Sequence, residues 1–120
     1  MSKRTDREFL SDIREAIHRI TAYSTGMAYE SFVADTKTQD AVLRNLEILS
    51  EATKNLSAQL RAEYPGIPWK SMAETRDRLI HHYFGVNLDI VWQIVALELP
   101  QVASQLQTII IEENEGENGG

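Results

Sequence analysis

An arginine, an aspartate, two histidines and a tyrosine lie within eight positions of one another, at Arg76, Asp77, His81, His82 and Tyr83. A histidine titrates near neutral pH, so it can accept or donate a proton during catalysis. An arginine can bind phosphate oxygens through two hydrogen bonds as negative charge develops on them. These groups suit cleavage of RNA without a metal ion, in which the ribose 2′-hydroxyl loses a proton and the 5′-oxygen gains one.

The spacing predicts how these residues share a helix surface. Residues 68–84 are expected to form one helix, on which Asp77 and His81 are neighbours and the carboxylate can fix the imidazole tautomer. Arg76 and Tyr83 share a face with the apolar stripe, where an arginine needs a phosphate, a carboxylate or a second subunit as partner. One helix can hardly aim Arg76 and His81 at one atom, whereas two helices across a two-fold axis can form a composite site.

Structural roles remain open for the same residues. Arg76 could pair with Glu74 or Asp77, and His81 and His82 could interact with the dipole at a helix C-terminus. By spacing alone, such an arginine–histidine pair is more often structural than catalytic. A metal site is weaker still, because adjacent residues on a helix point about 100° apart and the chain has no cysteine.

The composition restricts the class of protein. The chain has 120 residues, no cysteine and a formal net charge of −6, which fits one domain in a reducing compartment such as the cytoplasm. The amino terminus is charged and is not expected to be a secretory signal, and no apolar run approaches the roughly 20 residues of a membrane helix, so no membrane association is expected. Because an acidic protein repels nucleic acid at long range, contact with RNA would need a local basic cluster.

Apolar residues recur at spacings of three and four, which predicts an all-α antiparallel bundle of four to five helices. The first helix is expected over residues 5–24, with Thr5 and Glu8 forming a capping box. The second is expected over residues 38–63, where the apolar periodicity is clearest. The helices should run antiparallel, since the connections between them are short.

The second half continues the same pattern. A helix capped by Asn87 is expected, and Pro100 should either kink it or begin another helix. No strand is expected. Residues 1–111 are predicted to form the single domain, and the acidic, glycine-rich residues 112–120 a disordered tail.

Two segments carry a resemblance to a known family. The stretch GIPWKSMAETRDRLIHHYFGVNLDIVW resembles the HepT-like family of the HEPN superfamily, and TQDAVLRNLEILSEATKNL resembles the second long helix of that family. The likeness covers roughly residues 5–111. The family motif R-x-x-x-x-H-x-Y is met by Arg76, His81 and Tyr83, with Asp77 at a position where the family often has asparagine.

The resemblance implies an all-helical homodimer that acts as a metal-independent endoribonuclease on transfer RNA or messenger RNA. The motif then lies in a cleft on the dimer axis, with Arg76 and His81 as the catalytic pair. It further implies the toxin of a type VII-like toxin–antitoxin system. The antitoxin is expected to be an MntA-like nucleotidyltransferase that uses ATP and magnesium to add AMP to Tyr83, whereas the toxin itself needs no cofactor.

Further residues near the motif are assigned supporting roles. Lys70, Arg78 and His82 are predicted to help guide RNA, and Asp77 and Tyr83 to support its binding. The alternative is a non-catalytic helical partner of a minimal nucleotidyltransferase, which the low net basicity favours. A nucleotide-binding regulator is a third reading, but no phosphate-binding glycine loop supports it.

Overall fold

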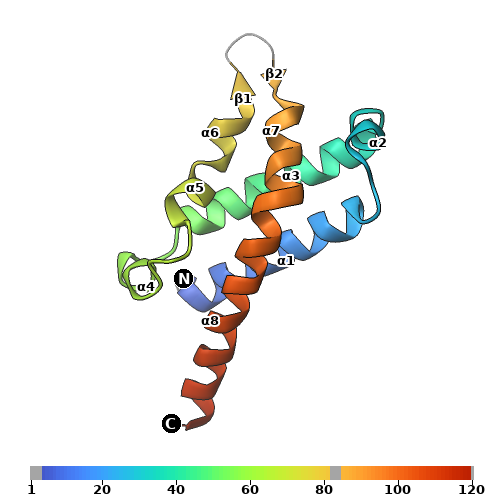
Figure 1. Cartoon of the computed structure of the whole chain (residues 1–120). Coiled ribbons are helices and arrows are strands. Elements are labelled where there is room, and N and C mark those ends of the chain that lie inside the picture. The colour runs from blue at the N-terminus through green and yellow to red at the C-terminus, as the bar shows by residue number, and fades with distance from the viewer. Residues whose placement is uncertain (1–3, 82–84, 120) are drawn as a thin grey trace.

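Helices account for most of the chain, and Figure 1 shows their arrangement in a computed structural model of the protein. The structure describes the backbone of residues 4–81 and 85–119, and the side chains of residues 4–79 and 85–109. The all-α prediction is confirmed, with two two-residue strands as the exception. In chain order the elements are α1 (Asp6–Ser24), α2 (Tyr29–Val33), α3 (Thr36–Lys54), α4 (Ala58–Glu63), α5 (Trp69–Ala73), α6 (Thr75–Leu79), β1 (Ile80–His81), β2 (Gly85–Val86), α7 (Leu88–Gln93), the π-helix η1 (Ile94–Glu98) and α8 (Leu99–Gly119).

The helices α1 and α3 lie side by side and antiparallel (Figure 1). The predicted capping box begins α1: the Glu8 N–H donates to Thr5 Oγ1 at 3.2 Å, and the Thr5 N–H donates to the Glu8 carboxylate at 3.3 Å. Both helices bury an apolar seam, in which Ile13 of α1 and Leu46 of α3 are fully buried. Burial of each such side chain contributes about 1.5–3 kcal/mol, so the pair is stabilised mainly by these seams.

The second predicted helix, residues 38–63, is divided in the structure into α3 and α4. Ser57 caps α4 by accepting a hydrogen bond from the Leu60 N–H at 3.1 Å. Asp6 in turn accepts from the N–H and the hydroxyl of Ser57, at 2.8 and 2.6 Å. The prediction of one continuous helix is wrong here, because a serine with these partners favours a new helix start over a helix interior.

The elements α7, η1 and α8 form one continuous rod, called the long rod below, which crosses the α1–α3 pair (Figure 1). It begins at the predicted cap, where Asn87 Oδ1 accepts from the Ile90 N–H at 3.2 Å. The π-helix η1 directly precedes the turn that contains Pro100. Proline has no N–H and its ring clashes with the carbonyl four residues earlier, and the wider π turn accommodates both effects without ending the rod.

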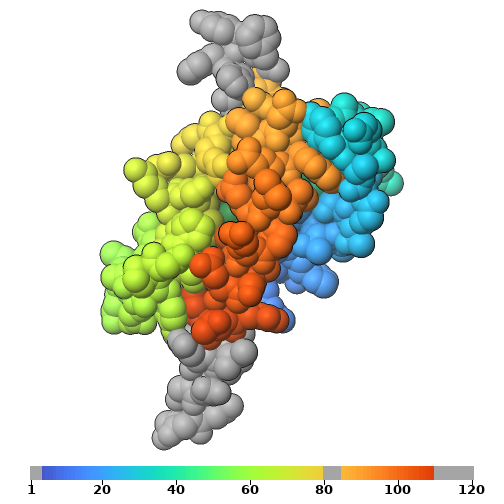
Figure 2. Space-filling model, in the orientation of Figure 1, coloured from blue at the N-terminus to red at the C-terminus, as the bar shows by residue number. Residues whose placement is uncertain are grey.

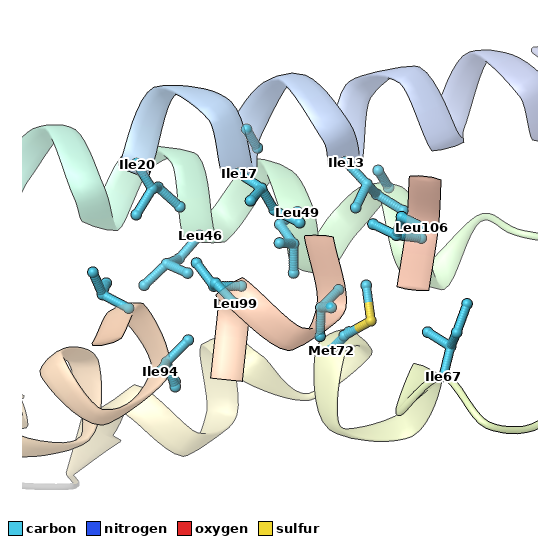
Figure 3. Packing of buried hydrophobic residues seen from close by; sticks show 14 of the residues in the cluster. Ile13, Ile17, Ile20, Leu46, Leu49, Ile67, Met72, Ile94, Leu99 and Leu106 are labelled. Carbon is cyan, nitrogen blue, oxygen red and sulfur yellow. The ribbon is translucent and has the colours of Figure 1, made fainter. Parts of the chain in front are cut away.

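Apolar side chains from α1, α3, α5 and the long rod meet in one cluster, whose members extend along the sequence from Leu10 to Ile109. Figure 2 shows the long rod packed between α5–α6 on one side and α1–α2 on the other. The cluster therefore ties the segments with chemically interesting residues to the helix pair. Figure 3 labels ten of its members: Ile13, Ile17, Ile20, Leu46, Leu49, Ile67, Met72, Ile94, Leu99 and Leu106.

The short helix α2 attaches to the long rod through aromatic contacts. The ring of Phe32, which is fully buried, lies 5.3 Å from that of Trp92, and the ring of Tyr29 lies 6.2 Å from it. The Tyr29 hydroxyl also donates a hydrogen bond to Asp89. This bond to a carboxylate raises the pKa of Tyr29, because ionising the phenol would remove the donor and place two negative charges together.

The carboxyl end of the long rod is rich in acidic residues and glycine. The backbone of α8 is helical to Gly119, and the disorder expected of residues 112–120 stays a prediction. Glutamates are good helix formers, and here they continue a helix that already exists, so no new nucleation is required. Within the described part of the chain, no helix has both the length and the apolar character needed to cross a bilayer.

Candidate active site

Arg76 lies on α6, which follows α5 after a turn at Glu74. The buried side of these two helices is formed by Trp69, Met72, Thr75 and Leu79. Arg76 follows Thr75 directly, so it lies on another side of the helix and is exposed. The prediction that Arg76 lies on the apolar stripe is therefore wrong. The turn at Glu74 interrupts the helix and brings Thr75, rather than Arg76, into line with Met72.

His81 lies in a strand and not on a helix. β1 pairs antiparallel with β2, and His81 is opposite Gly85. The Asn87 N–H donates to the Leu79 carbonyl at 2.8 Å and closes the reversal, while Gly85 has a φ of 75°, a conformation that favours glycine. The predicted helix over residues 68–84 therefore ends at Leu79, and the expectation of no strand is wrong, because the chain returns on itself where a longer helix would have continued.

The pairing predicted between Asp77 and His81 requires a helical spacing of four. Because β1 begins before His81, the observed backbone does not provide this relation. Asp77 itself is exposed on α6. The side chain of His81 and the whole of His82 and Tyr83 lie outside the described residues, so their roles, and the face expected to be shared by Arg76 and Tyr83, stay predictions.

Arg78, which was predicted to guide RNA, is bound within the protein. Its guanidinium donates two parallel hydrogen bonds to the Glu98 carboxylate, at 2.9 and 2.8 Å, and a third to Ser71 Oγ at 2.8 Å. The side chains of the pair are about one-third exposed, and the bonding to Glu98 raises the pKa of Arg78. This pair joins α6 to η1, so Arg78 fixes the helix that carries Arg76.

Lys70 is exposed on α5, and its predicted role in guiding RNA stays a prediction.

Three basic residues outside the motif are brought close to it by the fold. Arg76 lines a hollow of about 350 Å³ between α1, α3 and α6, together with Arg4, Arg44 and Lys54. Sequence reasoning missed these residues because the second helix was interpreted only through its buried seam. The signal present in the sequence was the charged stripe on the other side of that helix, formed by Arg44, Glu47, Glu51 and Lys54 at intervals of three and four.

Metal-ligand geometry gives no candidate among the described side chains, since no three of their histidines, aspartates or glutamates are grouped closely enough to hold an ion. An exposed guanidinium beside a basic hollow can bind an anion such as a phosphodiester.

Comparison with known proteins gives a consistent result. The family described as "Ribonuclease HepT-like" matches residues 13–109. A protein of Methanocaldococcus jannaschii named as a candidate RNase is 44% identical over 119 residues, which cover 98% of each chain. A protein of Thermococcus cleftensis named "Probable ribonuclease HepT" is 40% identical over 107 residues, 89% of this chain and 97% of the relative. No solved structure matches the chain significantly.

Proposed function

Because this chain belongs to the HepT-like ribonuclease family, we propose that it is an endoribonuclease acting as the toxin of a type VII-like toxin–antitoxin system. The observation that carries the proposal is the position of Arg76. It is an exposed arginine on α6, five residues ahead of His81 in β1, and it borders a hollow with three further basic residues. Such a guanidinium suits a polyanionic substrate.

The proposed reaction is a transesterification within the RNA strand. The ribose 2′-oxygen attacks the adjacent phosphorus while the bond from phosphorus to the 5′-oxygen breaks, which leaves a 2′,3′-cyclic phosphate and a 5′-hydroxyl. A histidine takes the 2′-hydroxyl proton and a second group protonates the departing 5′-oxygen. Arg76 binds the non-bridging oxygens, on which negative charge increases in the transition state. In this scheme protein groups accept the one proton that is removed and donate the one that is added, so no metal ion is required.

The proposed active form is a homodimer with a composite cleft. The reaction needs one proton acceptor and one donor, and each chain contributes a single motif histidine, His81. Two chains related by a two-fold axis would place two such histidines and two arginines around one phosphodiester. Asp77, Lys70 and His82 would then support RNA binding at the rim of this cleft.

The proposed control of the toxin acts on Tyr83. A partner nucleotidyltransferase of the MntA-like type, using its own ATP and magnesium, would transfer AMP to the phenol. The added bulk and negative charge would oppose the entry of an RNA phosphate near Arg76. Intact mass measurement tests this step, since AMP adds about 329 Da to protein made together with the neighbouring nucleotidyltransferase. An unchanged mass would contradict it.

The decisive experiment measures cleavage of single-stranded RNA by the purified full chain in the presence of EDTA. The Arg76→Gln and His81→Ala variants should each lose about 100-fold or more in rate. Lys37→Gln, an exposed lysine at the start of α3, serves as the control and should cleave like the wild type. Cleavage by His81→Ala at the wild-type rate would contradict the catalytic assignment, and loss of all activity in EDTA would contradict metal independence.

The same experiment separates the proposal from a non-catalytic role. The formal net charge of −6 favours a protein that binds a nucleotidyltransferase without acting on RNA. In that case the wild type would leave RNA intact, yet it would co-purify with the nucleotidyltransferase, and Arg76→Gln would weaken that complex.

A further inference from the structure

The hollow beside Arg76 combines helices that are distant in sequence. Its wall includes Phe9 of α1, Arg44 and Lys54 of α3, and Arg76 of α6. Its volume of about 350 Å³ falls within the roughly 300–1,000 Å³ typical of sites for small organic ligands. The hollow is therefore large enough for part of a single strand but not for a duplex.

Three cations of this wall are available to a ligand. Arg44, Lys54 and Arg76 are exposed, and none of them forms an ion pair with any residue the structure describes. Arg4 differs, because its guanidinium lies 2.7 Å from the Asp12 carboxylate and that bond raises its pKa. The ligand-binding charge of the hollow therefore resides on α3 and α6.

The local charge of the wall is opposite to that of the whole chain. Its four cations outnumber the carboxylates of Asp12, Glu47 and Glu51 by one, whereas the chain carries −6. Glu47 and Glu51 are three positions from Arg44 and Lys54 respectively, yet neither pair is among the ion pairs of the described residues. Both carboxylates stand between Arg44 and Lys54 on the same stripe of α3, and because carboxylates repel phosphate, the phosphates of a bound strand are expected at the two ends of that stripe.

The hollow also offers apolar surface. Phe9 and Ile48 are half-buried members of its wall, and the Arg4 guanidinium lies 5.0 Å from the centre of the Phe9 ring. Unpaired RNA bases are commonly bound by stacking on aromatic rings and arginine planes. Cations for phosphates and a ring with a stacked guanidinium for a base are thus present within one cavity.

We propose that this hollow is the subsite for a nucleotide flanking the bond that is cut, in a single-stranded RNA substrate. Arg44 and Lys54 bind the phosphates next to the scissile phosphate, which Arg76 binds, and Phe9 with Arg4 supports the base. The proposal rests on the proposed ribonuclease function and extends it by a substrate class and by residues on a helix outside the motif. It assigns Arg44 and Lys54 to RNA binding and not to the chemical step.

A binding experiment tests this assignment directly. In full-length protein carrying His81→Ala, the affinity for a fluorescent 12-nucleotide single-stranded RNA is measured across a salt series. Adding Arg44→Gln and Lys54→Gln should weaken binding at least tenfold and lower the slope of log K against log salt by about 1.4, since each phosphate contact to a single strand contributes about 0.7. Arg14→Gln with Lys37→Gln removes the same charge from exposed positions outside this hollow and should leave both values unchanged.

Two further variants keep the test specific. Arg44→Lys with Lys54→Arg preserves the charges and should retain the salt slope. In protein with His81 intact, Arg44→Gln with Lys54→Gln should raise KM and leave kcat near the wild-type value, because neither residue contacts the reacting phosphate. All variants should melt at the wild-type temperature, since the substituted side chains are exposed.

The outcomes distinguish this subsite from the proposed function itself. If both glutamine pairs weaken binding equally, or if neither does, the subsite is refuted while RNA cleavage by the wild type can still stand. If Arg44→Gln with Lys54→Gln lowers kcat and leaves KM unchanged, the assignment to binding is also refuted. If the wild type neither binds nor cleaves RNA, the proposed function fails and this inference fails with it.

Discussion

The α1–α3 pair and the arm formed by α5, α6 and β1 are stabilised in different ways. Each helix of the pair has 19 residues and a regular apolar seam. The elements of the arm have five, five and two residues. Helices this short are not stable by themselves, because nucleation costs more than one turn returns. The arm therefore needs contacts with other parts of the protein to stay folded. The two helices of the pair are instead specified by their own apolar periodicity.

Bonds to other elements hold the arm in place at the end of α5 and in α6. Ser50 of α3 donates to the Ala73 carbonyl of α5 at 2.6 Å, and Arg78 of α6 binds Glu98 of the long rod. Binding and catalytic groups are often found on such segments, which a rigid scaffold positions. Substitutions in the α1–α3 pair should therefore change global stability. Substitutions at the bonds that attach the arm should change its local order and the activity.

The largest expected effect is a loss of stability when the core of the α1–α3 pair is altered. Leu46→Ala removes a fully buried side chain and should lower the free energy of unfolding by about 2–5 kcal/mol. Leu97→Ala makes the same chemical change where the side chain is 65% exposed and should stay within about 0.5 kcal/mol of the wild type. Urea titration followed by circular dichroism measures both. Equal losses in the two variants would contradict the assignment of the core to the α1–α3 seam.

The next largest effect is expected when the Arg78–Glu98 pair, which attaches the arm, is weakened. Glu98→Gln weakens the bidentate pair with Arg78 and should cost about 1–2 kcal/mol. Amide hydrogen exchange should become faster in α6 than in α1, and the rate of RNA cleavage should fall because Arg76 is less firmly positioned. The matched control is Glu15→Gln, which breaks the Arg19–Glu15 pair.

That control pair is more than half exposed on both sides, so its loss should cost less than about 0.5 kcal/mol. Exchange that rises uniformly over α1 and α6 in Glu98→Gln would show that the arm is not a separate unit.

A smaller effect tests the start of the pair. Thr5→Ala removes the side chain that caps α1 and should cost about 1 kcal/mol, with both the hydroxyl acceptor and the reciprocal Glu8 bond affected. Thr108→Ala, at an exposed position within α8, provides the comparison and should change stability by less than about 0.5 kcal/mol. Thermal unfolding of the two variants side by side decides whether the capping box stabilises the folded state.

The smallest effect concerns pH at the start of α3. Hydrogen bonds from the Thr38 N–H and hydroxyl to the Asp35 carboxylate lower its pKa in the folded state. A lowered pKa means that this stabilisation is present above the unfolded value of about 4 and is lost as the pH falls through the folded value. Asp35→Asn should therefore be less stable than the wild type at pH 7, and the difference should shrink below pH 4. A difference that grows on acidification would contradict the shift.

Much of the fold could be predicted where local chemistry decides the structure. The capping box at Thr5 and Glu8, the seam of α1 and the cap at Asn87 are all formed as predicted, because each depends on residues within one or two turns. The break at Ser57 was missed because its stabilising partner, Asp6, is 51 residues away. The antiparallel pairing of β1 with β2 was missed for a related reason, since the spacing around His81 is equally compatible with a helix.

The candidate site shows the same division. The sequence alone determined that the chain is helical, that Arg76 and His81 are close along it, and which family it resembles, because these depend on residue types and short-range periodicity. Only the tertiary structure decided that Arg76 is exposed, that Arg78 is held by Glu98, and that Arg44 and Lys54 lie beside the motif. The physical reason is that burial, ion pairing and cavity shape depend on which distant segments meet, and no local pattern contains that information.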